Sequence, residues 1–368
     1  MPLIIIGLVV LLVIHLQNYC YRRLWDKGLE FRVLFSQRDA FVGDELQIRL
    51  ELTNKKFLPL TWVYVKAEMS KEFMSDRSPA DENDILKSTG MLTSIMMFSM
   101  LRKRTYFTCK KRGVFRLYRA KIDVSNLLHT EEFSKEVRLG GEVLIFPKTL
   151  DGLDSIDLVY KVVDSIVQSK ALINPDPFEF RGIREYQPTD ALKSINFKAT
   201  AISQKLMVNI HAPTTAYRLT IALDMDGSQN HTNWEVYEQS IRLAATLAKH
   251  YIEAGANLSF VTNGRDTASG EELSVRGGTS GAHMYKIYEA LARIALRLKP
   301  RAMCEFVDTI KDREQVYLFI SPYYGDDFLD SFHRLRERQV SAHLIIPYFR
   351  RPIVEIADNI TIWDARPD

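Results

Sequence analysis

A short run of oxygen-bearing side chains is the part of the sequence best suited to metal chemistry. Asp224, Asp226 and Ser228 stand at alternate positions directly after the apolar run 218–223. Alternate residues of an extended segment point to the same side, and hard oxygen ligands suit Mg²⁺, Mn²⁺ or Ca²⁺ rather than Zn²⁺. Thr279, in a Gly-rich stretch before an expected helix, offers one more hydroxyl. The pattern predicts a degenerate Mg²⁺ or Mn²⁺ site formed by Asp224, Asp226, Ser228 and Thr279.

A simpler interpretation of the same residues stays open. Asp226 and Ser228 are ordinary turn residues, and Thr279 or Ser280 is an ordinary helix N-cap. Under this interpretation the segment binds no metal.

A second polar group lies upstream, between residues 179 and 208. One hypothesis makes it a surface for a partner or for phosphate. The other makes it an internal clamp, in which Arg184 pairs with Asp190 or Glu185 while Tyr186 and Phe197 pack against a sheet. The residues singled out here are Arg184, Glu185, Tyr186, Pro188, Asp190 and Lys198.

Known catalytic patterns are otherwise missing from the sequence. It contains no Gly-x-x-x-x-Gly-Lys loop, no Gly-x-Ser-x-Gly elbow and no His-Glu-x-x-His pair. Its three cysteines lie far apart, and its formal net charge of +3 gives no case for nucleic-acid binding. We therefore expect a protein that is not an enzyme. The alternative is a metal-dependent hydrolase that uses Asp224, Asp226 and either Asp326 or Asp327.

The elements that position these residues follow from hydrophobic periodicity. After residue 217, short apolar runs alternate with amphipathic stretches, which predicts an α/β doubly wound domain with a mainly parallel sheet covered on both faces. Ligands of such sheets bind at the carboxyl ends of the strands. We expect strands at 218–223, 257–262, 315–321, 341–346 and 360–363, and helices at 234–253, 281–296, 302–311 and 326–338.

Residues 28–148 have a different pattern, with many short alternating runs such as 46–53 and 60–68. No long helical period occurs there, so we expect a small β-sandwich. Residues 150–169 have helical spacing and predict a connecting helix. The predicted fold is thus α+β multidomain, divided into an anchor at 1–27, the β-sandwich at 28–148, a linking segment at 149–212 and the α/β domain at 213–368.

The N-terminus is strongly apolar from residue 3 to residue 16 and reaches membrane-spanning length when extended to residue 21. Tyr19, Tyr21 and Trp25 would then form an interfacial aromatic belt. Arg22, Arg23 and Lys27 follow at once, which by the positive-inside rule predicts cytoplasmic domains. A cleaved signal peptide and an interfacial or buried helix remain as alternatives.

The order of short motifs resembles the bacterial domain of unknown function 58 family. Arg184-Glu185-Tyr186, Pro188, Asp190 and the run from Ile195 to Ala201 fall in that family's order, as do upstream motifs at 42–45, 111–115 and 144–147. Thr189, Phe197 and Thr200 depart from the family's glycine, tryptophan and serine.

The C-terminal part resembles a von Willebrand factor type A domain. Asp224, Ser228 and Thr279 match the metal-binding positions of that family, while Asp226 replaces a serine and Ser321-Pro322 stands where a Thr-Asp pair is usual. The two resemblances imply a membrane-anchored, non-catalytic adaptor of the bacterial cytoplasmic membrane. They imply that its von Willebrand factor type A-like domain binds a protein partner, such as a MoxR-type AAA+ ATPase, through the strand-end face. A third option is an inert structural protein of the envelope.

Overall fold

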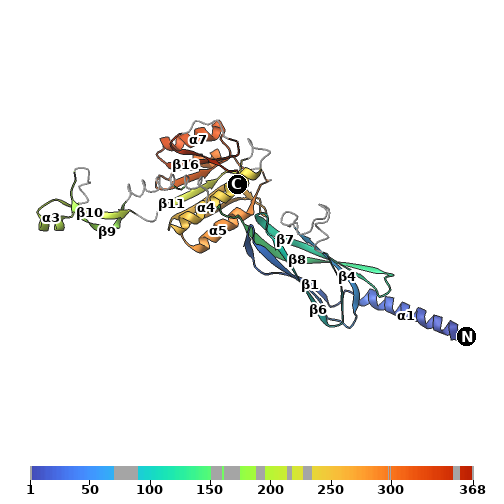
Figure 1. The fold of residues 1–368 in the computed structure, drawn as a ribbon. Coiled ribbons are helices and arrows are strands. Elements are labelled where there is room, and N and C mark those ends of the chain that lie inside the picture. The colour runs from blue at the N-terminus through green and yellow to red at the C-terminus, as the bar shows by residue number, and fades with distance from the viewer. Residues whose placement is uncertain are drawn as a thin grey trace. The chain divides into compact units, whose positions relative to one another are not determined.

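The computed structural model describes most of the chain. The described residues are 2–69, 90–150, 160, 175–187, 195–213, 218–226, 234–296, 298, 300–350 and 357–366. Ser228, Pro188, Asp190 and nearly all of the predicted connecting helix at 150–169 lie outside them. The chain divides into two compact units, Met1–Lys148 and Thr149–Asp368. The coarse prediction of a mixed α and β chain with an apolar N-terminal helix is confirmed (Figure 1).

Helix α1, Pro2–Leu24, opens the first unit. Its segment Ile4–Leu24 has a mean hydropathy of 2.0 and is long and apolar enough to cross a membrane. The side chains from Ile4 to Val13 are exposed, but Tyr21 is completely buried in the core of the β-structure that follows. The ring of Trp25 stacks on Phe133 at 5.6 Å. The expectation of an aromatic belt is therefore wrong for Tyr21, because its ring packs against protein.

Two sheets enclose one core in this unit. The first has the order β1-β3-β6 and the second has the order β2-β8-β7-β4-β5, and buried residues of both sheets belong to a single hydrophobic cluster. The strands are β1 Leu29–Phe35, β2 Asp39–Phe41, β3 Glu45–Asn54, β4 Leu60–Met69, β5 Met91–Ile95, β6 Ser99–Thr108, β7 Gly113–Ser125 and β8 Glu132–Phe146.

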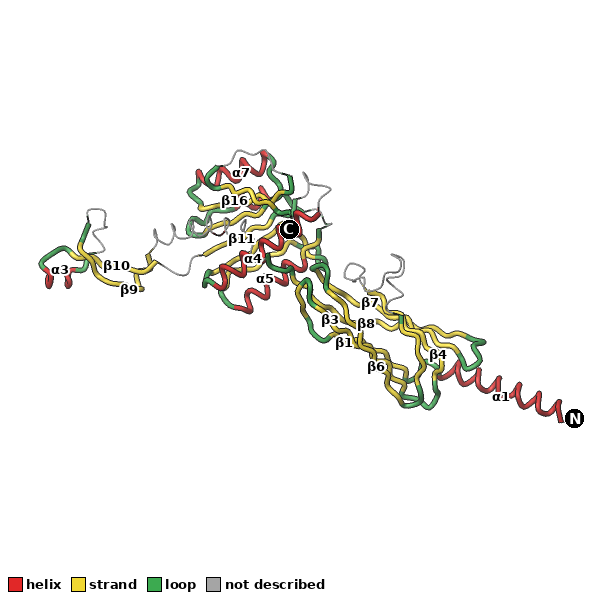
Figure 2. Tube along the Cα trace, viewed as in Figure 1, coloured by secondary structure: helices red, strands yellow, loops and turns green. Residues whose placement is uncertain are grey.

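Three connecting turns lie at one end of this unit; two of them join the two sheets and the third closes the β7–β8 hairpin. They connect β3 to β4, β5 to β6 and β7 to β8, and the strand registers bring all three to the end where α1 joins β1 (Figure 2). Buried Asn54 donates hydrogen bonds to the carbonyls of Leu58 and Met96, at 2.9 and 3.0 Å. One amide therefore ties two of the turns together.

The second unit is built on a seven-stranded sheet with the order β13-β12-β11-β15-β16-β17, to which β14 adds beside β12. Strands β12, β11, β15, β16 and β17 run parallel, whereas β13 is antiparallel to β12. The strands are β11 Arg218–Leu223, β12 Asn257–Asp266, β13 Glu272–Gly278, β14 Ile294–Ala295, β15 Val316–Ile320, β16 Ser341–Tyr348 and β17 Ile360–Asp364.

Helices cover this sheet. Helix α4, Trp234–Glu253, contacts β11, β12 and β16, and α5, Gly281–Arg293, packs beside it. Helices α6, Met303–Thr309, and α7, Asp326–Glu337, share a second core with the strands β15 and β16. Strand β11 has β12 on one side and β15 on the other, so the chain reverses its direction of winding at the carboxyl end of β11.

A small separate element precedes the sheet. Strand β9, Pro175–Glu185, pairs antiparallel with β10, Met207–Pro213, and helix α3, Phe197–Ser203, lies between them in sequence. We call the described residues 175–187 and 195–213 the signature hairpin, because they contain most of the residues singled out upstream.

Replacing Asn54 by alanine tests the tie between the turns. Asn54→Ala leaves the carbonyls of Leu58 and Met96 without their donor, so we expect the free energy of unfolding to fall by about 2–4 kcal/mol. Chemical denaturation in detergent micelles measures this change. The control is Gln47→Ala, which removes an exposed hydrogen bond from the Gln47 amide to the Tyr106 hydroxyl and should change stability little. Equal stabilities of the two variants would contradict the assignment.

Candidate functional site

Asp224 lies at the carboxyl end of β11, where the sheet changes its winding direction, and is only 1% exposed. Its backbone N–H donates to the carbonyl of Ile320 on β15 at 2.9 Å, which extends the parallel ladder by one residue. The predicted position of this carboxyl group at a strand end is thus the observed one. Its surroundings, however, differ from those of an open metal site.

Three donors of the protein itself converge on the Asp224 carboxyl group. The Ser321 hydroxyl lies 2.7 Å from Oδ2, while the Asn263 amide and the Asp226 N–H donate to Oδ1 at 2.7 and 2.9 Å. Ser321 follows β15 and Asn263 belongs to β12, so the ends of three adjacent strands meet at one carboxyl group. We call Asp224, Asn263 and Ser321 the strand-end clamp.

The two partners of Asp224 are themselves anchored. Asn263 accepts from the Met225 N–H at 2.8 Å and donates a second bond to the Arg301 carbonyl at 2.8 Å. Ser321 accepts from the Tyr323 N–H at 3.1 Å. The Tyr237 hydroxyl donates to the backbone carbonyl of Asp226 at 2.8 Å. The clamp therefore connects strand β12 to the residues that directly follow β11 and β15 and to the backbone of Arg301.

Burial controls the protonation of this site. Desolvation raises the pKa of Asp224 to about 6, against the lowering effect of its hydrogen-bond donors. The Ser321 hydroxyl has one proton but two acceptors at 2.7 Å, the Asp224 carboxyl and the Tyr323 carbonyl. When Asp224 is protonated it can donate to Ser321, which then donates to Tyr323, and every group is satisfied.

Thr279 does not join Asp224, and its predicted place in the site is wrong. Leu219 of β11 is in register with Leu258 of β12, which is in register with Gly278 of β13. Asp224 lies five residues further along β11, or about 17 Å at ~3.3 Å per residue. Because β13 runs antiparallel to β12, Thr279 lies near the amino ends of the parallel strands, whereas Asp224 lies at their carboxyl ends. The neighbouring Ser280 caps α5 instead, accepting from the His283 N–H.

The residues described do not fit the divalent cation that the resemblance implies. No group of three or more His, Cys, Asp or Glu side chains among them could hold a metal ion. Both oxygens of Asp224 face N–H or O–H donors, whereas a cation needs acceptor oxygens. Asp326 and Asp327 are in the first turn of α7, and Asp327 accepts from the Tyr323 hydroxyl at 2.7 Å.

Sequence reasoning missed Asn263 and assigned no role to Ser321. Both are the polar residues that follow the apolar part of a parallel strand, as Asp224 does, and this shared position was the available signal. Ser321 was interpreted only as a departure from a family pattern. The structure shows that its hydroxyl donates a hydrogen bond to the carboxyl group of Asp224.

The signature hairpin uses its polar residues locally. Asn196 caps α3 by accepting from the Ala199 N–H at 2.9 Å, and the Thr200 hydroxyl accepts from the Met207 N–H at 3.0 Å. The Arg184 guanidinium donates to the Glu185 carbonyl at 3.1 Å. The side chain of Lys198 is exposed. The predicted pairing of Arg184 with Asp190 lies outside the described residues.

Apolar side chains of the signature hairpin are exposed. The expectation that Phe197 packs against a sheet is wrong, because this residue is 78% exposed. Ile202 is 79% exposed, Leu206 49% and Ile183 41%. Helix α3 has no buried residue at all.

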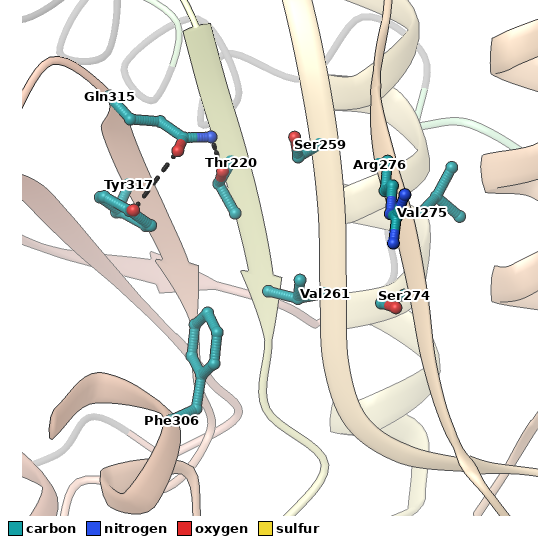
Figure 3. A pocket seen from close by; sticks show the side chains of 9 residues that line it. All are labelled: Thr220, Ser259, Val261, Ser274, Val275, Arg276, Phe306, Gln315 and Tyr317. Atoms are coloured by element: carbon teal, nitrogen blue, oxygen red, sulfur yellow. Dashed lines mark hydrogen bonds between the residues drawn. The ribbon is translucent and has the colours of Figure 1, made fainter. Parts of the chain in front are cut away.

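A pocket of about 290 Å³ lies on the sheet and is lined by residues that do not belong to the clamp. Figure 3 shows Gln315 between the hydroxyls of Tyr317 and Thr220, to both of which it is hydrogen bonded. The pocket is lined by Thr220, Ser259, Val261, Ser274, Val275, Arg276, Phe306, Gln315 and Tyr317. These groups offer neutral hydrogen bonds and one cation, and they include no carboxylate or histidine that could act as a general base.

The pH dependence of stability tests the protonation of the clamp. A carboxyl group whose folded pKa lies above its unfolded value stabilises the protein when protonated, and this contribution is lost as pH rises from about 4 to about 6. Asp224→Asn keeps an acceptor for Asn263 and offers a donor to Ser321. We expect the variant to gain up to about 3 kcal/mol relative to wild type between pH 4 and 7, measured by thermal unfolding in detergent. A constant difference across this range would contradict the assignment.

Titration calorimetry tests the metal question separately. We expect neither Mg²⁺ nor Mn²⁺ to give a binding isotherm with the full-length protein or with Asp224→Ala, because the carboxyl oxygens already accept hydrogen bonds. Saturable binding by wild type that disappears in Asp224→Ala would overturn this expectation.

Comparisons with solved structures give weak likenesses. The CARDB domain of a Pyrococcus furiosus protein, solved in complex with di-metal ions, is 10% identical with a TM-score of 0.22, covering 32% of this chain and 94% of that one. The C-terminal domain of wzt is 9% identical with a TM-score of 0.23 and coverages of 34% and 77%. Spo0M, a sporulation control protein of Bacillus subtilis, is 10% identical with a TM-score of 0.18 and coverages of 44% and 58%. At these scores the likenesses carry no functional argument.

The family comparison concerns the second unit. No curated protein matches the chain. Residues 182–346 match the family model described as "Protein of unknown function DUF58". This stretch runs from the signature hairpin to the strand β16 and includes the strand-end clamp. The finer likeness to a von Willebrand factor type A domain stays a prediction, and the match over residues 182–346 supports the DUF58 family for this chain.

Proposed function

We propose that this protein is a membrane-anchored, non-catalytic adaptor that binds a protein partner through its signature hairpin. The observation that carries the proposal is the exposed apolar surface of Ile183, Phe197, Ile202 and Leu206. These four large apolar side chains belong to one small element, and exposed apolar surface of this kind is typical of a site that another molecule covers.

The size of the signature hairpin supports the same conclusion. A seven-residue helix is far below the ~12–15 residues at which an isolated helix becomes marginally stable in water. An isolated two-stranded hairpin is also only marginally stable in water. The caps at Asn196 and Gln204 and the strand pairing hold the backbone, but no buried side chain of α3 stabilises it. Contact with a partner would supply the missing apolar burial.

The strand-end clamp supports a role without catalysis. Its only carboxyl group is buried, engaged by internal donors and fixed between three strands. A catalytic acid or base must reach a substrate atom within hydrogen-bond distance. The clamp instead stiffens the end of the sheet, a role suited to a scaffold. The sequence predicts that the partner binds at the strand-end face; the exposed side chains favour the signature hairpin.

The anchor and its orientation complete the proposal. Helix α1 crosses the cytoplasmic membrane of a bacterium once, and Arg22, Arg23 and Lys27 retain its C-terminal end, with both folded units, on the cytoplasmic side. By resemblance the partner is a MoxR-type AAA+ ATPase. A cytoplasmic orientation is consistent with that partner, because an ATPase needs the ATP of the cytoplasm.

Photo-crosslinking from the signature hairpin tests this proposal. We expect a photoreactive amino acid at position 197 of the full-length protein, in its native membrane, to form an adduct with a MoxR-type AAA+ ATPase. The same group at Tyr118, a residue 57% exposed on β7, should give no such adduct. An adduct from both positions, or from neither, would contradict the proposal.

Substitution of the apolar side chains gives the matching measurement. Burial of a phenylalanine contributes about 1.5–3 kcal/mol, so Phe197→Asp should weaken co-purification of the ATPase about tenfold or more. Tyr118→Asp should leave it unchanged. Because Phe197 contributes little to the protein's own core, both variants should retain the wild-type circular dichroism spectrum. Undiminished co-purification with Phe197→Asp would count against the signature hairpin as the docking element.

A further inference from the structure

The three connecting turns beside α1 carry exposed apolar side chains at their tips. Phe57 is 74% exposed, Met96 65% and Phe98 67%, and Leu127 and Leu128 are 47% and 49% exposed. The rings of Phe57 and Phe98 contact each other at 6.1 Å across two turns. We call Phe57, Met96, Met97, Phe98, Leu127 and Leu128 the apolar tips.

Hydrogen bonds fix the tips at the level of the last turns of α1. Asn126, which precedes Leu127, donates to the Asn18 side chain at 2.9 Å. The Tyr21 hydroxyl donates to the carbonyl of Pro59 at 2.7 Å, and Phe57 lies two residues before that proline. The tips therefore lie beside the helix segment from Asn18 to Trp25.

The length of α1 then determines where the tips lie in a membrane. Its freely exposed apolar part, residues 4–16, is about 20 Å long at ~1.5 Å per residue. The hydrocarbon core of a bilayer is ~30 Å thick. The candidate span Ile4–Leu24 includes the last two turns of α1, so the tips beside those turns enter the membrane with them.

The side chains around the tips suit a lipid surface. Arg22, Arg23 and Lys27 are exposed at the same end, and the guanidinium of Arg23 lies 5.5 Å from the centre of the Tyr19 ring. Apolar side chains that enter the acyl boundary, flanked by cations that meet anionic headgroups, are typical of interfacial membrane contacts. A protein partner would not explain why the tips share the level of the helix end.

We infer that the apolar tips insert into the interfacial region of the bilayer that α1 crosses, so that the first unit is seated in the membrane by its turns as well as by its helix. This inference rests on the membrane span in the proposed function. The ligand is the lipid bilayer itself, with anionic headgroups near the flanking cations. The tips thereby supply the apolar depth that residues 4–16 lack.

Fluorescence quenching by spin-labelled lipids tests the inference on the full-length protein. An environment-sensitive label is attached at Phe98→Cys or Leu128→Cys after reconstitution into vesicles of phosphatidylethanolamine and phosphatidylglycerol. Cys20 and Cys304 are replaced by alanine, whereas Cys109 is buried and burial raises its pKa to about 11, so its thiol stays unlabelled. A label at Leu12→Cys tests whether α1 crosses the bilayer. A label at Lys111→Cys, at the opposite end of the first unit, is the control that should stay in water.

The expected result is several-fold stronger quenching at positions 98 and 128 than at 111, greatest for lipids labelled near the headgroup, with position 12 quenched by lipids labelled deep in the acyl chain. If the label at position 12 is quenched by deep spin labels but the labels at positions 98 and 128 are quenched no more than the label at 111, the insertion of the tips is overturned and the span stays intact. No quenching at 12 would overturn the span and the inference together. The double substitution Phe57→Ser and Phe98→Ser should reduce the quenching of the label at position 128, since the tips insert as one group.

Discussion

The burial of Tyr21 in the core of the first unit is the contact on which the arrangement at the membrane depends. A helix that only tethered a domain would leave its last turn free, but here Tyr21 is completely buried and its hydroxyl is bonded to the Pro59 carbonyl. The helix and the β-structure thus form one body at this end. Any depth that the end of α1 reaches in a bilayer is also reached by the neighbouring turns.

A comparable constraint organises the second unit. The carboxyl group of Asp224 joins three parallel strands at the point where the sheet changes its winding direction. Burial makes its charged form costly, and three internal donors partly offset that cost. The strand-end position is used here for internal cohesion. Under the proposed function, recognition of a partner therefore falls to surfaces elsewhere in the unit.

The sequence predicted those parts of the structure that follow from local periodicity. Alternating apolar and polar residues located the strands β3 and β4, and short continuous apolar runs located β11 and β15. The parallel order placed Asp224 at a strand end. Thr279 was misplaced because the antiparallel strand β13 was not expected. Its alternation of half-buried Leu273 and Val275 with exposed neighbours was the signal that was overlooked. The packing of Tyr21 and the exposure of Phe197 depend on contacts between distant segments, which no local pattern reports.

The central claim is that α1 crosses a membrane and holds the first unit against it. Alkaline carbonate extraction of native membranes tests this most directly, by comparing wild type with a variant carrying Leu11→Lys and Leu12→Lys, two residues 65% and 67% exposed on the helix. The account predicts that wild type remains in the membrane pellet while the variant is released, because two lysines at the centre of a span cost roughly 5 kcal/mol or more. Release of the wild-type protein by carbonate would contradict it.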